Sequence, residues 1–341
     1  MCIMVMAVGA HNDYPFVLAH NRDEYFARAT TPLQQNGDIL CATDELSGGT
    51  WMGVNVATGE VAALTNIRSR PAARAVRSRG ELVLRTLRGD AAAATTSSDY
   101  ANFNLVHGRL SSDGTPTMTF AVSAPPDSTS HTQPVPHGDN HPFIGVKSND
   151  HGGHWTTPDS DPGDVCTWPK AKWLCDEVAR ALAANSVQAA KGAADARGVL
   201  FDALEALMSA RAMPGSPVAA NVMRLAPYTS LSAADEENVQ HAPCVTPFEM
   251  RSEAGPGDAR AKCMYGTVSQ TILIQCKSEG CLLYGYRAAS PSGVDAESDH
   301  ARVGGKRPRG DGVRTRRQRC ASDAFGEWNW QRVALKPATA R

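Results

Sequence analysis

Hydrophobic residues in this chain form short runs separated by glycine, proline and polar residues, a pattern that is typical of β-strands. Two runs open the chain. Residues 2–8 are all apolar, and residues 16–20 form a second run after the turn-forming sequence at 11–15. A continuous apolar run predicts a strand that is covered on both faces. An antiparallel hairpin is therefore expected, and it would bring the polar residues 21–24 back beside the start of the chain.

Later segments extend this pattern along the chain. Apolar residues at helical spacing predict helices at residues 78–87, 168–182 and 199–208. The Pro- and Ser-rich stretch 123–141 is expected to be a loop, and the mixed stretch 212–260 is expected to be irregular. Further strands are predicted at residues 39–41, 48–56, 60–66, 102–106, 117–122, 143–149, 263–274, 281–286 and 325–335.

Cys2 is the first candidate for chemistry. It follows Met1 directly, and its side chain is small enough for an aminopeptidase to remove Met1. Removal leaves a thiol and an α-amine on one residue. An α-amine titrates near pH ~7.7–8.0 and a thiol near ~8.5, so the amine can act as base for its own nucleophile. The alternative is a buried strand that begins with Cys, since free Cys is among the most buried residue types.

The predicted hairpin bears on the same question. It brings Arg22 and the carboxylates of Asp23 and Glu24 close to Cys2. A cation and carboxylates beside a thiol are the groups that tune thiolate nucleophiles. The predicted hairpin therefore adds support for a reactive thiol at Cys2.

Composition narrows the class of protein. The chain has 341 residues and a formal net charge of -1, so a sizeable core is expected and no general attraction to nucleic acids or membranes. No apolar run approaches the ~18 residues of a membrane span. The short N-terminal run has no Lys or Arg before it, unlike a secretory signal. Nine Cys without CxxC pairs do not resemble a disulfide framework, and we expect an intracellular protein with reduced thiols.

Polar residues at strand ends supply further candidates. Asn66 and Asn149 each end a predicted strand, and for Asn66 the alternatives are an amide that points into a site and an ordinary strand end. His151 and His154 lie in a Gly-rich stretch, but metal binding needs more ligands at fixed geometry, and no metal is expected. The stretch 288–322 is basic and expected to be disordered. A solvated insertion is favoured over a nuclear-import or RNA-contact role, so no nucleic-acid partner is expected.

Taken together, these segments resemble the NRDE family, also called the transport and Golgi organisation 2 family. The resemblance begins with Met1-Cys2-Ile3 and with Asn21-Arg22-Asp23-Glu24. Further matching segments follow in the family's order and cover nearly the whole chain: Gly48-Gly49-Thr50-Trp51, Ala63-Leu64-Thr65-Asn66, Arg79-Gly80-Glu81-Leu82-Val83, Phe103-Asn104-Leu105, Ser148-Asn149, Trp168-Pro169 and Tyr265-Gly266-Thr267.

The resemblance implies a fold and a set of site residues. The family is similar to N-terminal-nucleophile hydrolases, whose fold is an α+β, four-layer αββα sandwich. Residues 1–287 and 323–337 are expected to form one such domain, interrupted by the insertion at 288–322. The analogy is to the choloylglycine hydrolase and penicillin acylase group, and it rests on fold. By that analogy the catalytic residues are Cys2 as nucleophile, Asp23 as its contact, and Asn149 and Asn66 as oxyanion donors.

The resemblance also implies a biological setting. The family is associated with Golgi organisation, protein secretion and haem mobilisation, in the cytoplasm and in mitochondria. A haem, acyl or lipid molecule is therefore an expected ligand, with Asn21, Arg22 and Trp51 as contact residues; without a CxxCH site, a haem contact would be non-covalent. Three interpretations stay open: a haem- or lipid-handling protein that supports trafficking, an acyl-amide hydrolase acting through Cys2, and a non-catalytic scaffold of the same fold.

Two positions depart from the family pattern. Most members carry Arg after the Tyr-Gly-Thr segment, whereas this chain has Val268. Valine cannot replace a bidentate contact of arginine with an anion. His20 stands before the Asn-Arg-Asp-Glu segment in place of a small residue. Either change can alter the ligand, and neither disturbs the expected fold.

Overall fold

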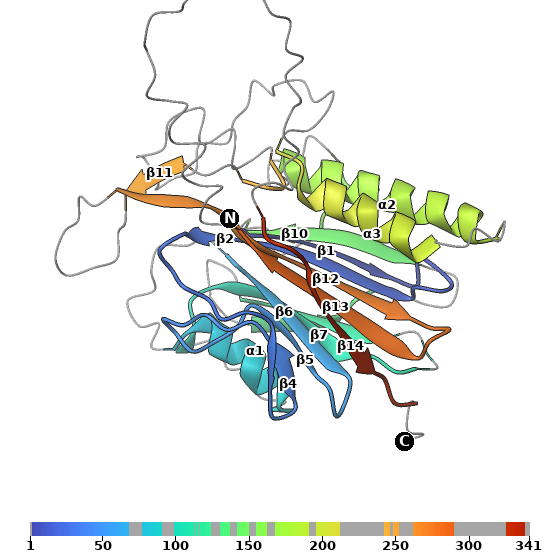
Figure 1. Ribbon diagram of the computed structural model, residues 1–341, viewed down its shortest axis with the longest axis horizontal. Helices are drawn as coiled ribbons and strands as arrows, with labels where there is room; N and C mark the ends of the chain where they lie inside the picture. The colour runs from blue at the N-terminus through green and yellow to red at the C-terminus, as the bar shows by residue number, and fades with distance from the viewer. Residues whose placement is uncertain are drawn as a thin grey trace, which may run out of the picture.

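The computed structural model is a mixed α+β fold in which antiparallel sheets carry most of the regular structure (Figure 1). The predicted α+β class is confirmed. All statements below concern the described residues, which are 2–67, 77–90, 99–112, 114, 116–123, 130–136, 142–149, 155–161, 168–190, 196–211, 242–245, 248–251, 262–289 and 325–337.

One sheet holds the start of the chain near its centre. Its strand order is β10-β1-β2-β12-β13-β14, with β11 paired to β12, and all of these pairs are antiparallel. β1 and β2 form the predicted hairpin, in which Ile3 lies opposite Asn21. The strands of this sheet are β1 Ile3–Val8, β2 Phe16–Tyr25, β10 Phe143–Ser148, β11 Phe248–Arg251, β12 Lys262–Cys276, β13 Cys281–Ala288 and β14 Asn329–Ala334.

The other sheet follows the order of the sequence. Its strands run β3-β4-β5-β6-β7-β8-β9, and each pairs antiparallel with the next. Short turns join several neighbouring strands of this meander, whereas helix α1 (Arg79–Leu87) lies within the longer connection between β6 and β7. The strands are β3 Gln34–Asn36, β4 Ile39–Cys41, β5 Met52–Asn55, β6 Glu60–Asn66, β7 Phe103–Arg109, β8 Thr117–Ser123 and β9 Ser130–Pro134.

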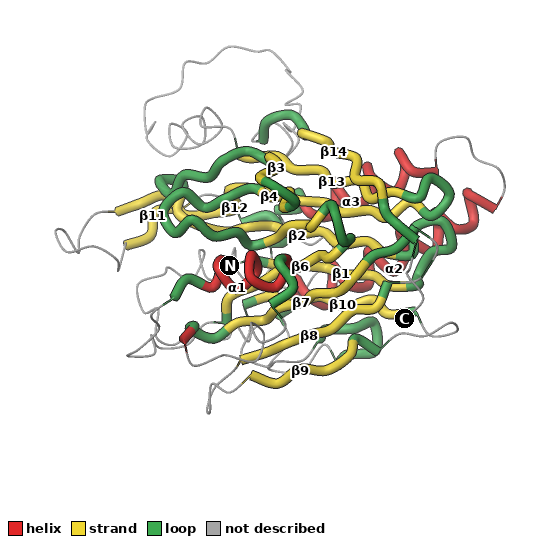
Figure 2. The backbone as a smooth tube through the Cα atoms, turned by 90° about the horizontal axis from the view of Figure 1, so that it is seen from below, coloured by secondary structure: helices red, strands yellow, loops and turns green. Residues whose placement is uncertain are grey.

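Helices cover the outer face of each sheet, and the two inner faces pack against each other (Figures 1 and 2). Met4 and Met6 of β1 face the second sheet, while Ile3 and Val5 face the helix Pro169–Ala190. Because both faces of β1 are covered, all of its residues are apolar, as the sequence predicted. The helices are α1 Arg79–Leu87 on the second sheet, and α2 Pro169–Ala190 and α3 Ala196–Met208 on the first.

Two glycines explain how the start of α1 meets the loop before β5. Ser78 caps α1 by accepting a hydrogen bond from the Gly80 N–H. The loop approaches so closely that a Cβ added at Gly49 would lie 2.5 Å from the Gly80 carbonyl carbon. The Thr50 N–H donates to the Gly80 carbonyl at 3.2 Å. The loop before β5 and the start of α1 are far apart in the sequence. They are joined by close backbone packing that only glycine permits.

The structure corrects several predicted boundaries. β2 continues to Tyr25 and so contains the polar residues 21–24, because β12 supplies hydrogen-bonding partners along this length. β9 lies in the stretch 123–141, predicted as a loop, where it pairs with the edge of β8. β11 lies in the stretch 212–260, predicted as irregular. β3 was not predicted because its residues are polar and exposed.

Other predictions fall outside the described residues. These are the histidines at 151–154 and nearly all of the basic stretch 288–322. Among the helices that are described, none combines the length and the hydropathy that a membrane crossing requires. The same part of the chain contains no group of three or more His, Cys, Asp or Glu side chains arranged to hold a metal ion.

Candidate functional site

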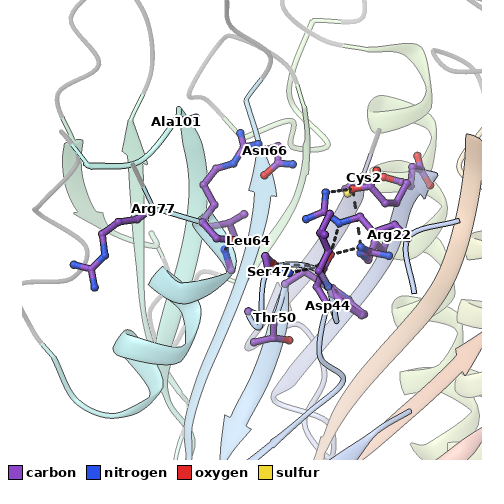
Figure 3. Close-up of a pocket in the computed structure, with 18 residues that line it drawn as sticks. Cys2, Arg22, Asp44, Ser47, Thr50, Leu64, Asn66, Arg77 and Ala101 are labelled. Atoms are coloured by element: carbon purple, nitrogen blue, oxygen red, sulfur yellow. Dashed lines mark hydrogen bonds and ion pairs between the residues drawn. The ribbon is translucent and has the colours of Figure 1, made fainter. Parts of the chain in front are cut away.

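A cavity of about 400 Å³ lies where the two sheets, the loop before β5 and the start of α1 meet (Figure 3). Cys2 and Arg22 reach it from the first sheet, and Leu64 and Asn66 reach it from the second. The predicted nucleophile thus shares a cavity with other predicted site residues, namely Asp23, Asn66, Arg22 and Trp51. Its charged wall residues are Arg22, Asp23, Glu24, Arg28, Asp44, Arg77 and Arg79.

Cys2 is held by the ends of two strands. Its Sγ lies 3.9 Å from the backbone oxygen of Asp23, to which the thiol donates, and its own carbonyl accepts a hydrogen bond from Ser148 Oγ at 3.0 Å. Burial raises the pKa of the thiol, while the positively charged amino terminus and Arg22 act in the opposite direction. The resting thiol is therefore protonated at neutral pH, and any attack by this sulfur needs a base to accept its proton.

Asp23 is fixed by residues of β12. Its backbone oxygen accepts from Tyr265 Oη at 3.2 Å, and its Oδ1 accepts from Thr267 Oγ1 at 2.6 Å. The pairing of β2 and β12 shifts between Thr267 and Ser269, so Val268 sits at a bulge, a feature that re-aims neighbouring side chains. We did not predict Tyr265 or Thr267 as site residues, although the Tyr-Gly-Thr segment was the available signal.

The contact between Asp23 and Cys2 is made by the backbone. The thiol points to the Asp23 carbonyl, whereas the carboxylate is bound by Thr267. Both groups belong to the wall of the same cavity. The orienting role of the Asp23 carboxylate toward an α-amine therefore stays a prediction.

Arg22 contacts both Asp44 and Trp51 in the cavity wall. Its Nη2 donates to Asp44 Oδ2 at 2.6 Å, and its guanidinium lies 4.7 Å from the centre of the Trp51 ring, a cation–π distance. Its Nη1 has no hydrogen-bond partner among the described residues. Two predicted ligand contacts, Arg22 and Trp51, thus stack on each other in the cavity wall.

Asp44 is the shared anion of this cluster. Besides Arg22, it contacts Arg28 Nε at 2.6 Å, and its Oδ1 accepts from the Leu46 and Ser47 N–H groups, each at 3.1 Å. Burial raises the pKa of this carboxyl, but Arg28 and Arg22 outweigh burial and hold the pKa below its usual value. Neither Asp44 nor Arg28 was predicted, because a single acidic residue between two strands carries no distinctive signal.

The three predicted asparagines have different positions. Ser148 lies opposite Ile3 in the pairing of β10 with β1, so Asn149 follows at the level of Cys2; its side chain is buried, and its Oδ1 has no hydrogen-bond partner among the described residues. Asn66 ends β6 and lines the cavity. Asn21 is not in the cavity wall. Its Nδ2 donates to the Met208 and Pro243 carbonyls at 2.7 and 2.9 Å.

His20 connects the two sheets. Its Nε2 donates to the Leu64 carbonyl at 3.2 Å, and the side chain is fully buried. Burial lowers the pKa of this imidazole to about 4, so the ring is neutral at physiological pH. His20 thus adds a buried hydrogen bond between β2 and β6.

Comparisons with known proteins give consistent results. A family model described as Transport and Golgi organisation 2 matches residues 1–285. The Transport and Golgi organization protein 2 homolog of Bos taurus is 40% identical over 85 residues, 23% of this chain and 30% of the relative. The Homo sapiens homolog is 38% identical over 85 residues with the same coverage. An uncharacterized protein of Saccharomyces cerevisiae is 36% identical over 77 residues, 20% of this chain and 24% of the relative. The chain thus aligns with less than a third of each of these relatives.

Proposed function

Because this chain belongs to the Transport and Golgi organisation 2 family, we propose that it supports Golgi organisation and secretion by hydrolysing an acyl amide at Cys2. The observation that carries the hydrolase proposal is the position of Cys2. Its thiol lies at the end of a central strand, in the wall of a cavity that Arg22, Asp23 and Asn66 also line. The order of layers, helix, sheet, sheet and helix, supports the further proposal of an N-terminal-nucleophile hydrolase fold.

The proposed reaction begins once Met1 has been removed. The α-amine of Cys2 accepts the thiol proton, and the thiolate attacks the carbonyl carbon of the amide. The tetrahedral intermediate collapses when the C–N bond breaks, and the protonated α-amine gives its proton to the leaving amine. Water then hydrolyses the thioester and releases the carboxylic acid. Burial raises the pKa of the thiol, so the thiol needs a base that accepts its proton, and the α-amine of the same residue provides that base.

Two amides are proposed as oxyanion donors. Asn149 follows the β10 residue that pairs with Ile3, so it lies at the level of Cys2, and Asn66 lines the cavity from β6. Ser148 fixes this region, because its carbonyl accepts hydrogen bonds from Thr65 Oγ1 at 3.3 Å and Asn104 Nδ2 at 3.2 Å. Ser148 and Thr65 directly precede Asn149 and Asn66, so this network fixes the backbone that carries both proposed donors. Donors on a fixed backbone need little rearrangement when negative charge develops on the substrate oxygen.

Substitution of the nucleophile tests the hydrolase proposal. Wild type, Cys2→Ser and Cys41→Ser are incubated with acyl amides of aminomethylcoumarin that carry acetyl to palmitoyl chains, and released coumarin is measured. Cys41 is a buried thiol on the second sheet that does not line the cavity, which makes Cys41→Ser a matched control. We expect hydrolysis by wild type and Cys41→Ser and none by Cys2→Ser.

The outcome also separates the other interpretations. Equal turnover by wild type and Cys2→Ser, or none by either, would reject Cys2 as a hydrolytic nucleophile and favour a ligand-handling or scaffold role. Secretion of a reporter protein in cells that lack this chain tests the biological half of the proposal. Rescue by wild type but not by Cys2→Ser would show that the role in secretion depends on Cys2. Rescue by both proteins would show that the role in secretion does not depend on Cys2.

A further inference from the structure

Two cysteines face each other across the β12–β13 hairpin, away from the Cys2 cavity. Cys276 is the last residue of β12, Cys281 is the first residue of β13, and the two are direct partners in the antiparallel register. Directly paired residues of antiparallel strands point to the same face of the sheet. Both side chains accordingly belong to the core cluster on the helix-covered face, and both are free thiols.

The register satisfies the main geometric requirement for a disulfide. Opposite residues in an antiparallel pair have Cα atoms about 4.5 or 5.5 Å apart, depending on the hydrogen-bonding position. Disulfides span Cα separations of roughly 4.4–6.8 Å. Either type of pair therefore allows Cys276 and Cys281 to be joined without moving the strands.

Charged side chains lie beside this thiol pair. The Cys281 thiol donates to Glu279 Oε2 at 3.8 Å, and the charges of Arg197 and Arg332 act on Cys276 and Cys281. Both guanidiniums are paired with Glu279, at 2.5 and 3.3 Å, and their side chains are 47% and 61% exposed. Exposed side chains that can turn aside thus lie next to the buried thiols.

The same side chains line a groove of about 570 Å³ on the outer face of the first sheet. Ile274 and Leu283 lie two residues from the cysteines on the same face of their strands and form part of the groove. Among the charged groove residues, Arg197 and Arg332 outnumber Glu279. A small anionic molecule is therefore favoured electrostatically beside the thiols.

We propose that Cys276 and Cys281 form a redox-modification site that becomes an intrachain disulfide by exchange with a small anionic disulfide such as glutathione disulfide. One protein thiolate attacks the small disulfide, forms a mixed disulfide and releases one glutathione thiolate. The second protein thiolate attacks the mixed disulfide at the protein sulfur and releases the second glutathione. Two electrons pass from the protein to the small disulfide, and the two thiol protons leave with the two glutathione molecules.

Local chemistry agrees with two interacting thiols. Burial raises the pKa of Cys276 to about 11, and the neighbouring Cys281 and Glu279 add to the rise, while Arg197 opposes it. Each arginine can stabilise one thiolate when it forms. Cys175 lacks this arrangement. Its thiol donates to the Ile144 carbonyl at 3.8 Å, and it provides a matched buried control.

The test uses the full-length chain equilibrated in buffers with rising ratios of oxidised to reduced glutathione. Remaining thiols are blocked with N-ethylmaleimide, and peptides are identified by mass spectrometry without reduction. We expect Cys276 and Cys281 to lose their alkylation together as a peptide cross-link between them appears, while Cys175 stays alkylated. Cys281→Ser and Cys281→Ala should both abolish the cross-link, and Cys175→Ser should leave it unchanged.

Other outcomes would overturn the proposal. Full alkylation of both cysteines at every ratio would show that the pair is not oxidised by this class of molecule. A stable glutathione adduct on one cysteine, without the cross-link, would show that the second thiol does not reach it. Circular dichroism of each variant confirms that the hairpin is tested in folded protein.

Discussion

The cluster around Asp44 provides a direct test of how the cavity wall is held together. We consider Asp44→Asn, which keeps the shape of the side chain and an acceptor for the Leu46 and Ser47 N–H groups. The substitution removes the charge that faces Arg22 and Arg28, both at 2.6 Å. Arg22 then remains buried and stacked on Trp51, and the carboxylate that stays near its Nη2 is that of Glu24, at 4.0 Å.

The size of the effect follows from burial. Removal of one partner of a buried ion pair typically destabilises a protein by about 3–5 kcal/mol, because it leaves an uncompensated charge. The side chains of Arg22 and Asp44 are 6% and 8% exposed, but that of Arg28 is 31% exposed and can be solvated. We therefore expect Asp44→Asn to lower the free energy of unfolding by about 3 kcal/mol, the lower end of that range.

Urea unfolding followed by tryptophan fluorescence measures this loss, and Glu81→Gln supplies the matched control. Glu81 pairs with Arg77 through side chains that are 37% and 39% exposed. An exposed pair of this kind contributes about 0.2–1 kcal/mol. If Asp44→Asn costs no more than Glu81→Gln, the buried network does not stabilise the cavity wall and the reasoning is wrong.

The pH dependence of the same comparison checks its cause. The pKa of Asp44 is lowered in the folded state, so its contribution to stability is complete above the unfolded pKa of about 3.9 and is lost as pH falls through the folded pKa. At acid pH a protonated Asp44 resembles Asn. The stability difference between wild type and Asp44→Asn should therefore shrink below pH ~3.9 and stay constant from there to neutral pH.

Three further substitutions test other parts of the structure. Asp23→Asn should slow acylation of Cys2 by an acyl electrophile about 10²-fold, measured by labelling rate, with a small change in melting temperature; an unchanged rate with a lower melting temperature would assign Asp23 a structural role. The pKa of His20 is lowered to about 4 by burial, so the unfolded state binds the proton more tightly. Wild type should lose about 2–3 kcal/mol more stability than His20→Gln between pH ~7.5 and ~4.5 in urea unfolding, and parallel losses would contradict a buried neutral imidazole. Gly80→Ala should destabilise the protein by about 1–3 kcal/mol, because its Cβ would lie 2.8 Å from the Thr50 nitrogen; an unchanged melting temperature would refute the close backbone contact.

Much of the fold could be predicted because its strands are short and apolar and its turns contain glycine and polar residues. β1 was predicted from a continuous apolar run, and α1 was predicted as a helix at residues 78–87. Strands that lack an apolar pattern could not be predicted. β3 is polar and exposed, and β9 forms where the edge of β8 offers free backbone groups.

The candidate site could be predicted where a segment carried a distinctive group of residues, and not where a residue's role depends on which strands pair. Cys2, Arg22 and Trp51 were predicted from such segments, and all line one cavity. Thr267 binds the carboxylate of Asp23 from 244 residues away, a contact that depends on the pairing of β2 with β12. Asn21 directly precedes Arg22 in the same tetrapeptide, but its amide binds two carbonyls outside the cavity wall, whereas Arg22 lines the cavity. Alternation of side chains along a strand explains why neighbours in that tetrapeptide face different surroundings.

The most direct test of the central claim is a peptide map of the N-terminus after reaction with an acyl electrophile. Native protein is treated under conditions that leave it folded, digested, and analysed by mass spectrometry together with Cys2→Ser. Hydrolysis through Cys2 requires an N-terminal peptide that begins at Cys2 and carries the acyl group on that residue, either on the thiol or, after S-to-N acyl migration during digestion, on the α-amine. A peptide that retains Met1, or an acyl group found on other residues in both proteins, would contradict the assignment of Cys2 as the nucleophile.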